Sequence, residues 1–168
     1  MDNYTKNFDD VLQKIEAARI EADEHRIIKI VAASKYVGSD EINAMYEIGQ
    51  RCFGENKIQD LKSKSLELIE LPIEWHYIGK TQTNKINALL DLDPFLIHSI
   101  ENLEMAKEVD KRAKVKEMRV DCLLQINSAD EESKGGCTLS GAKEIYKQIQ
   151  NECESLNLKG VMSIGAHS

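Results

Sequence analysis

Short apolar runs alternate with longer amphipathic runs along almost the whole chain, and no other feature of the sequence restricts the fold as strongly. The first apolar run, 27–34, is nearly continuous and rich in β-branched residues, which is typical of a parallel strand covered on both faces. Five further short runs follow, at 51–54, 74–78, 95–98, 120–126 and 158–164. The sequence therefore predicts six strands.

Amphipathic segments precede and separate these strands. Apolar residues recur at helical spacing in the first segment, between Phe8 and Ala18. Further helices are predicted to start at Ser39 and Asn102, to span about 57–70 and 85–90, and to carry an apolar face between 139 and 153. Six β units joined by five helices indicate an all-parallel α/β architecture with right-handed crossovers. An open doubly wound sheet and a β/α barrel of TIM type both fit this order.

The chain has 168 residues and contains no linker rich in glycine, serine or proline, so we expect a single domain over 1–168. A complete eightfold barrel usually needs about 250 residues and rarely fewer than ~200. The length alone therefore argues against a complete barrel.

The charge balance excludes several function classes. The chain carries 22 basic and 29 acidic residues, a net charge of -7, which argues against nucleic-acid binding through overall charge. No apolar stretch approaches the ~20 residues of a membrane span, and residues 1–10 do not form a secretory signal. We therefore expect a cytoplasmic protein without a membrane partner. The four cysteines and four histidines show no metal-ligand spacing, so no metal is predicted and the cysteines are expected to be reduced and mostly buried.

Polar, small or ionisable residues follow each predicted strand. They stand at 34–35, 54–56, 76–79, 98–99, 125–127 and 163–165. Because the carboxyl ends of parallel strands meet at one edge of the sheet, these residues are predicted to form a shared pocket.

Lys35 is the sharpest candidate among them. Desolvation at the end of an apolar strand lowers the pKa of a lysine and favours the neutral, nucleophilic amine that a Schiff base requires. The alternative is a lysine that extends to the surface just after the strand, and the local sequence alone favours that alternative. His76 and His98 are each either ligand contacts or packed core residues, and the second is the commoner case.

Two further segments have weak motif content. Gly79-Lys80-Thr81 matches the end of a Walker A motif, but Glu74 stands where its first glycine is required, so the segment is predicted to be a polar helix start. The charged stretch 130–136 is predicted to be a solvated loop, with a lid as the alternative.

An ordered set of segments resembles one known family. The matching segments are 31–35, 53–56, 74–79, 82–85, 97–99, 131–134 and 160–165. In this order and spacing the chain closely resembles the pyridoxal-phosphate homeostasis proteins of the YggS/PROSC type. The resemblance implies a barrel like the N-terminal domain of alanine racemase.

The resemblance also implies a cofactor and a role. Pyridoxal 5′-phosphate (PLP) would be held as a Schiff base on Lys35, and Asn56, His76, Ser99 and the pair Ile164-Gly165 would line its pocket. The role is intracellular vitamin B6 and amino-acid homeostasis, without established catalysis. The alternatives are a PLP-dependent racemase-like enzyme, which would need a second base from a separate β-domain, and a cofactor-free lysine enzyme of aldolase type.

The chain departs from the family at its C-terminal end. Six β units average about 28 residues each, so a complete barrel of this kind would need roughly 224 residues. The resemblance implies two further barrel units that carry phosphate-binding segments, so we expect a truncated form of a longer product, or an incomplete record, that lacks them. The resemblance implies a monomer for the full-length family, whereas exposed sheet edges favour association of a truncated barrel. We also expect the truncated chain to bind PLP weakly or not at all.

Overall fold

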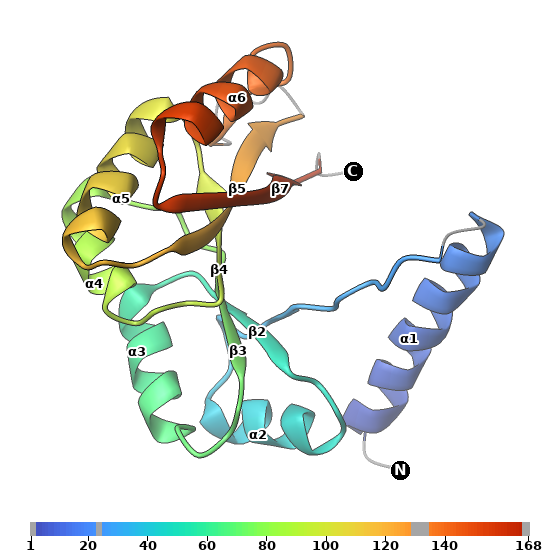
Figure 1. The fold of residues 1–168 in the computed structure, drawn as a ribbon. Coiled ribbons are helices and arrows are strands. Elements are labelled where there is room, and N and C mark those ends of the chain that lie inside the picture. The colour runs from blue at the N-terminus through green and yellow to red at the C-terminus, as the bar shows by residue number, and fades with distance from the viewer. Residues whose placement is uncertain (1–2, 23–24, 129–134, 166–168) are drawn as a thin grey trace.

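A curved, all-parallel sheet forms the centre of the molecule (Figure 1). The computed structural model describes residues 3–22, 25–128 and 135–165. The strands are β1 (Ala32–Ala33), β2 (Cys52–Glu55), β3 (Glu74–Tyr77), β4 (Leu96–Ile100), β5 (Val120–Asn127), β6 (Cys137–Thr138) and β7 (Leu156–Ser163). The spatial order runs from β1 to β6, and β7 also pairs with β5.

Helices alternate with the strands as the sequence predicts. They are α1 (Asn3–Glu21), α2 (Ser39–Glu47), α3 (Ile58–Glu67), the 3₁₀ turn η1 (Thr83–Lys85), α4 (Ile86–Leu90), α5 (Leu103–Val115) and α6 (Ala142–Glu152). Asn102 caps α5, because its side-chain oxygen accepts a hydrogen bond of 2.8 Å from the Met105 amide. The predicted parallel α/β fold is confirmed.

The apolar core lies between the sheet and the helices on its convex side (Figure 1). Ile97 and Leu124 of the sheet are fully buried, as are Val109 of α5 and Leu89 of α4. Since side chains alternate between the two faces of a strand, the neighbouring residues of these strands face the concave side. The concave side therefore carries a separate set of side chains.

The sheet does not close into a barrel among the residues that the structure describes. β1 pairs with β2, and β7 pairs with β5. β1 and β7 do not pair with each other. The prediction that 27–34 is a strand covered on both faces is wrong for 27–31, because this segment pairs with no described strand. Ile27 and Ile28 are 96% and 52% exposed, because no strand lies beside this edge to cover them.

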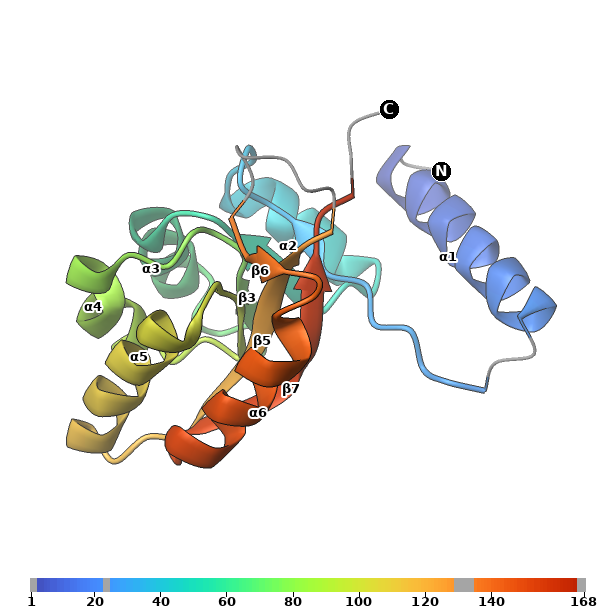
Figure 2. The same cartoon turned by 90° about the horizontal axis from the view of Figure 1, so that it is seen from above.

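Helix α1 stands apart from the sheet (Figure 2). Its apolar residues have helical spacing, as predicted, but none of them is buried. The link at 25–31 joins it to β1 (Figure 1).

Several details differ from the sequence prediction. The two-residue strand β6 was not predicted, and Leu139 lies before α6 rather than on its apolar face. The predicted loop or lid at 130–136 and the family segment 131–134 fall largely or wholly outside the described residues. All four cysteines are free and buried, as predicted. Within the described part of the chain, no helix has the length and apolarity needed to cross a membrane.

Candidate functional site

A cavity of about 540 Å³ opens at the carboxyl ends of β1, β2 and β3. It combines cationic side chains with amide side chains and a glycine turn. Its lining residues are Lys35, Asn56, Lys57, Ile58, Gln59, Tyr77, Ile78, Gly79, Lys80, Gln82 and Lys85. The predicted clustering of residues after neighbouring strands therefore holds for Lys35, Asn56 and Gly79.

Lys35 reaches the cavity from the turn that follows β1. It is only partly buried, and its Nζ lies 5.0 Å from the centre of the Tyr36 ring, within the range of a cation–π contact. Of the two alternatives that the sequence left open, the structure lacks the deeply buried lysine, because only Ala32 and Ala33 belong to the strand before it. Lys35 is therefore accessible to a ligand in the cavity.

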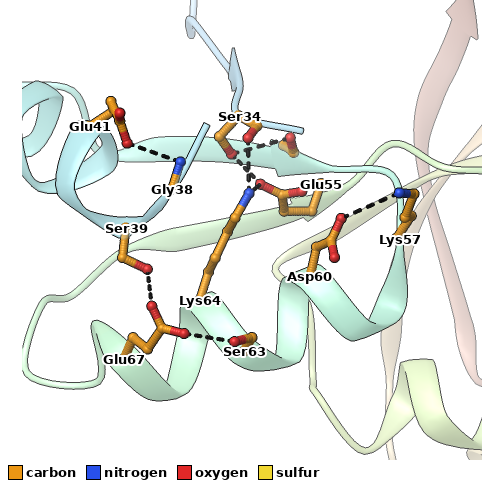
Figure 3. Close-up of polar contacts among 11 residues, drawn as sticks. Ser34, Gly38, Ser39, Glu41, Glu55, Lys57, Asp60, Ser63, Lys64 and Glu67 are labelled. Carbon is orange, nitrogen blue, oxygen red and sulfur yellow. Dashed lines mark hydrogen bonds and ion pairs between the residues drawn. The ribbon is translucent and has the colours of Figure 1, made fainter. Parts of the chain in front are cut away.

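A buried ion pair fixes the backbone beside Lys35 (Figure 3). Lys64 of α3 donates hydrogen bonds to Glu55 Oε1 at 2.7 Å and to the carbonyl oxygen of Ser34 at 2.9 Å. The Ser34 hydroxyl donates to the same carboxylate oxygen at 2.6 Å. Since Glu55 is fully buried, this network locks the ends of β1 and β2 to helix α3.

Gly79 permits a close approach between two of the strand ends. A Cβ at this position would lie 2.0 Å from the backbone oxygen of Asn56, so no side chain fits. The Ser99 hydroxyl donates a hydrogen bond to the Gly79 carbonyl oxygen and lies 3.0 Å from Thr81 Oγ1. The Gly79 turn is therefore fixed by close packing against the Asn56 backbone and by the hydrogen bond from Ser99.

Replacing Gly79 by alanine is expected to destabilise the fold by about 3 kcal/mol, because the clash is with backbone and cannot be relieved by a rotamer change. Urea unfolding followed by circular dichroism measures the change. Gly165→Ala is the matched control, since a Cβ there meets no atom within 4 Å. Equal stability of the two variants would contradict the tight approach.

The charge on the cavity wall is positive, although the chain as a whole is acidic. Lys35, Lys57, Lys80 and Lys85 line it, and no acidic side chain of the described residues does. Lys57 and Lys80 have only loose ion pairs, at 3.9 Å to Asp60 and 3.6 Å to Glu101. Exposed pairs of this length hold a lysine weakly, so these ammonium groups remain available to an anion.

Asn56 adds an unsatisfied polar atom. Its side-chain Oδ1 is buried and has no hydrogen-bond partner in the structure. Buried polar atoms are nearly always paired, so an orphan atom in a cavity-lining residue is typical of a ligand-binding position. The cavity thus offers a primary amine, cationic groups and an unpaired acceptor.

His76 and Ser99 do not line the cavity. His76 is 2% exposed and lies on the concave face of β3, where its Nδ1 is 2.8 Å from His98 Nε2. Burial, with a smaller contribution from His98, lowers the pKa of His76 to about 4, and burial also lowers the pKa of His98. Both histidines therefore favour the neutral form.

Ile164 and Gly165 lie just after β7 and are exposed. They are not among the residues that line the cavity. The six predicted site residues thus fall into three groups. Lys35 and Asn56 line the cavity, whereas His76 and Ser99 are buried outside its lining, and Ile164 and Gly165 are exposed after β7.

The sequence reasoning missed two parts of the site. It assigned Lys80 to a polar helix start and did not weigh Lys57, Lys80 or Lys85 as ligand contacts. It also placed Lys64 within the predicted helix at about 57–70 without giving it a role. Extending the strand-end rule by one residue past Gly79 would have found Lys80, whereas the contact between Lys64 and Glu55 has no local signal.

Comparison with known proteins decides the family. The family model described as alanine racemase, N-terminal domain, matches residues 5–168. The chain belongs to this family. A curated pyridoxal phosphate homeostasis protein of Helicobacter pylori is 49% identical over 166 residues, which cover 99% of this chain and 75% of that protein.

Two solved structures extend the comparison. An unknown protein from Bifidobacterium adolescentis matches 100% of this chain and 74% of its own with a TM-score of 0.88 at 29% identity. PipY of Synechococcus elongatus with PLP bound matches 89% of this chain and 70% of its own with a TM-score of 0.69 at 25% identity. The described fold is therefore the β/α-barrel type of this family, with a sheet that stays open.

Proposed function

We propose, against the sequence-based expectation of weak or absent binding, that this chain binds PLP as a Schiff base on Lys35 and acts in intracellular vitamin B6 homeostasis. The observation that carries the proposal is the cavity itself, in which an accessible lysine shares a wall with further cationic groups and with the Asn56 oxygen. The PLP-bound PipY structure and the curated homeostasis relatives support the choice of ligand. When bound, PLP supplies an aldehyde carbon that condenses with a primary amine and releases water.

The residues of the cavity fit the two ends of such a ligand. Lys35 supplies the amine, and Lys57, Lys80 and Lys85 supply positive charge for a phosphate. Asn56 presents an acceptor that suits a hydroxyl or protonated ring nitrogen. Each of these groups is already in place around the same space, so little reorganisation is required.

The remaining site residues are proposed in supporting roles. Ser99 holds the Gly79 turn and so shapes the cavity floor. His76, Ile164 and Gly165 are assigned to the cofactor pocket by family resemblance, but the described cavity does not include them.

We propose a binding role without catalysis. A racemase needs a second acid–base group opposite the lysine, and the tyrosine of the cavity wall is Tyr77. Its hydroxyl donates a hydrogen bond of 3.1 Å to the Lys80 carbonyl oxygen, and burial raises its pKa. Tyr77 is therefore poorly suited to exchange a proton with a substrate.

Covalent trapping tests the proposal. The chain is incubated with PLP, reduced with borohydride, digested and mapped by mass spectrometry. We expect a single predominant label on Lys35. A label spread over Lys57, Lys80, Lys85 and the other exposed lysines in proportion to their exposure would defeat the proposal.

The same preparation separates the binding role from racemisation. PLP-loaded chain is incubated with L-alanine, and the D-isomer is measured by chiral chromatography. We expect no interconversion above that of free PLP. Turnover that depends on Lys35 would show that the chain is an enzyme.

A further inference from the structure

A second cluster of functional groups lies on the concave face of the sheet, away from the cavity. Cys52 begins β2 and Glu74 begins β3, and these two residues are partners in the parallel ladder. His76 follows two residues after Glu74, so its side chain projects from the same face. One ligand atom from each residue, a sulfur, a carboxylate oxygen and a ring nitrogen, lies within 4.8 Å of the other two.

The two ring nitrogens of His76 have different surroundings. Its Nδ1 faces His98 Nε2 at 2.8 Å, and its Nε2 is buried without any hydrogen-bond partner in the structure. The His76 residue is only 2% exposed to solvent. An imidazole that ligates a metal almost always gives its other nitrogen to a neighbouring acceptor, which fixes the ring. His98 Nε2 is this acceptor when His76 Nδ1 carries the proton.

We propose that Cys52, Glu74 and His76 form a binding site for Zn²⁺ or a similar borderline-soft divalent cation. Sulfur, oxygen and nitrogen donors in one group suit Zn²⁺, and three protein ligands leave a fourth position for water. As the metal–sulfur bond forms, the Cys52 thiol proton passes to solvent. The thiolate and the carboxylate then balance the two charges of the ion.

The contacts of Glu74 show that this carboxylate already attracts positive groups. Lys29 Nζ lies 2.5 Å from Glu74 Oε2, and the Cys52 thiol donates to the same oxygen at 3.2 Å. Lys29 belongs to the exposed segment before β1, and its side chain is 47% exposed. The ammonium group can therefore withdraw to solvent, and the cation takes over its place beside the carboxylate.

The site lies outside the cavity at Lys35, and its test does not require PLP. None of its three ligands lines the cavity at Lys35. Sequence spacing did not reveal it, because the ligands come from two strands and from two residues on one face of β3.

Titration with Co²⁺ tests the proposal on the purified, chelator-treated chain. We expect one Co²⁺ per chain, with a sulfur-to-cobalt charge-transfer absorption that Zn²⁺ then abolishes by displacement. Cys52→Ser removes the charge-transfer band, and Cys153→Ser, which alters another buried thiol, retains it. A band that persists in Cys52→Ser, or no sulfur-based band in the wild-type chain, overturns the proposal.

Two further variants guard against loss of folding. Glu74→Gln and His98→Leu, each checked by circular dichroism, are expected to weaken Zn²⁺ binding, His98→Leu by roughly 10- to 100-fold. Lys29→Met removes the competing ammonium group and is expected to bind Zn²⁺ at least as tightly as the wild type. Unchanged affinity in folded Glu74→Gln and His98→Leu would show that the ion binds elsewhere.

Discussion

Replacing Lys64 by methionine is expected to destabilise the chain by about 3–5 kcal/mol, the largest loss of stability from any single substitution proposed for it. Methionine nearly preserves the length of the side chain but removes the charge. The Glu55 carboxylate is fully buried and would keep only the Ser34 hydroxyl as a partner. One of its oxygens, Oε2, already has no hydrogen-bond partner, so little remains to stabilise the charge.

Urea unfolding at neutral pH measures this effect, and two variants control it. Lys57→Met alters an exposed lysine near the start of the same helix, whose ion pair spans 3.9 Å, and is expected to change stability by less than about 0.5 kcal/mol. Adding Glu55→Gln to Lys64→Met removes the stranded charge and is expected to recover much of the loss. A Lys64→Met variant within about 1 kcal/mol of wild type would show that the pair is dispensable.

The pair also couples the fold to the cavity. Lys64 donates to the carbonyl oxygen of Ser34, the residue immediately before Lys35. In a folded Lys64→Met variant, the backbone before Lys35 loses this hydrogen bond, so the Lys35 side chain is expected to be less well positioned in the cavity. The Lys64–Glu55 ion pair holds the backbone at the end of β1 and so orients the partly exposed Lys35 side chain, whose own contacts are weak.

The sequence predicted the order of strands and helices because each element carries its own periodicity. The run at 120–126 and the helix cap at Asn102 are local signals, and both match the structure. The segment 27–31 has the same local signal, but a strand also requires a neighbour. No described strand pairs with it, so Ile27 and Ile28 stay exposed.

The candidate site was predictable only in part, for a related reason. Lys35 and Asn56 follow strands directly, and the strand-end rule finds them without knowledge of the sheet. The cluster of Cys52, Glu74 and His76 depends on the register between β2 and β3, and the pairing of Lys64 with Glu55 depends on how α3 packs. Neither the register nor the packing is encoded within one segment.

Replacing Lys35 by alanine is expected to abolish the covalent PLP label that borohydride fixes at this site. Lys35→Arg is the matched control for charge, because arginine keeps the positive group but its guanidinium does not form the Schiff base. Both variants are therefore expected to lose the label, although Lys35→Arg preserves the electrostatic environment. Retention of wild-type labelling by either folded variant would remove Lys35 from the proposal.

The dependence on phosphate distinguishes a specific site from ordinary lysine reactivity. The other cationic groups of the wall, Lys57, Lys80 and Lys85, would hold the phosphate of PLP but have nothing to hold in pyridoxal. Changing all three to glutamine is expected to weaken PLP labelling of Lys35 by roughly 100-fold, since three charges that each contribute on the order of 1 kcal/mol in water sum to about 3 kcal/mol. Labelling by pyridoxal should change little, and inorganic phosphate should compete with PLP only in the wild-type chain. Equal loss for PLP and pyridoxal would mean that these lysines tune Lys35 itself, and the phosphate would have to be held by other groups.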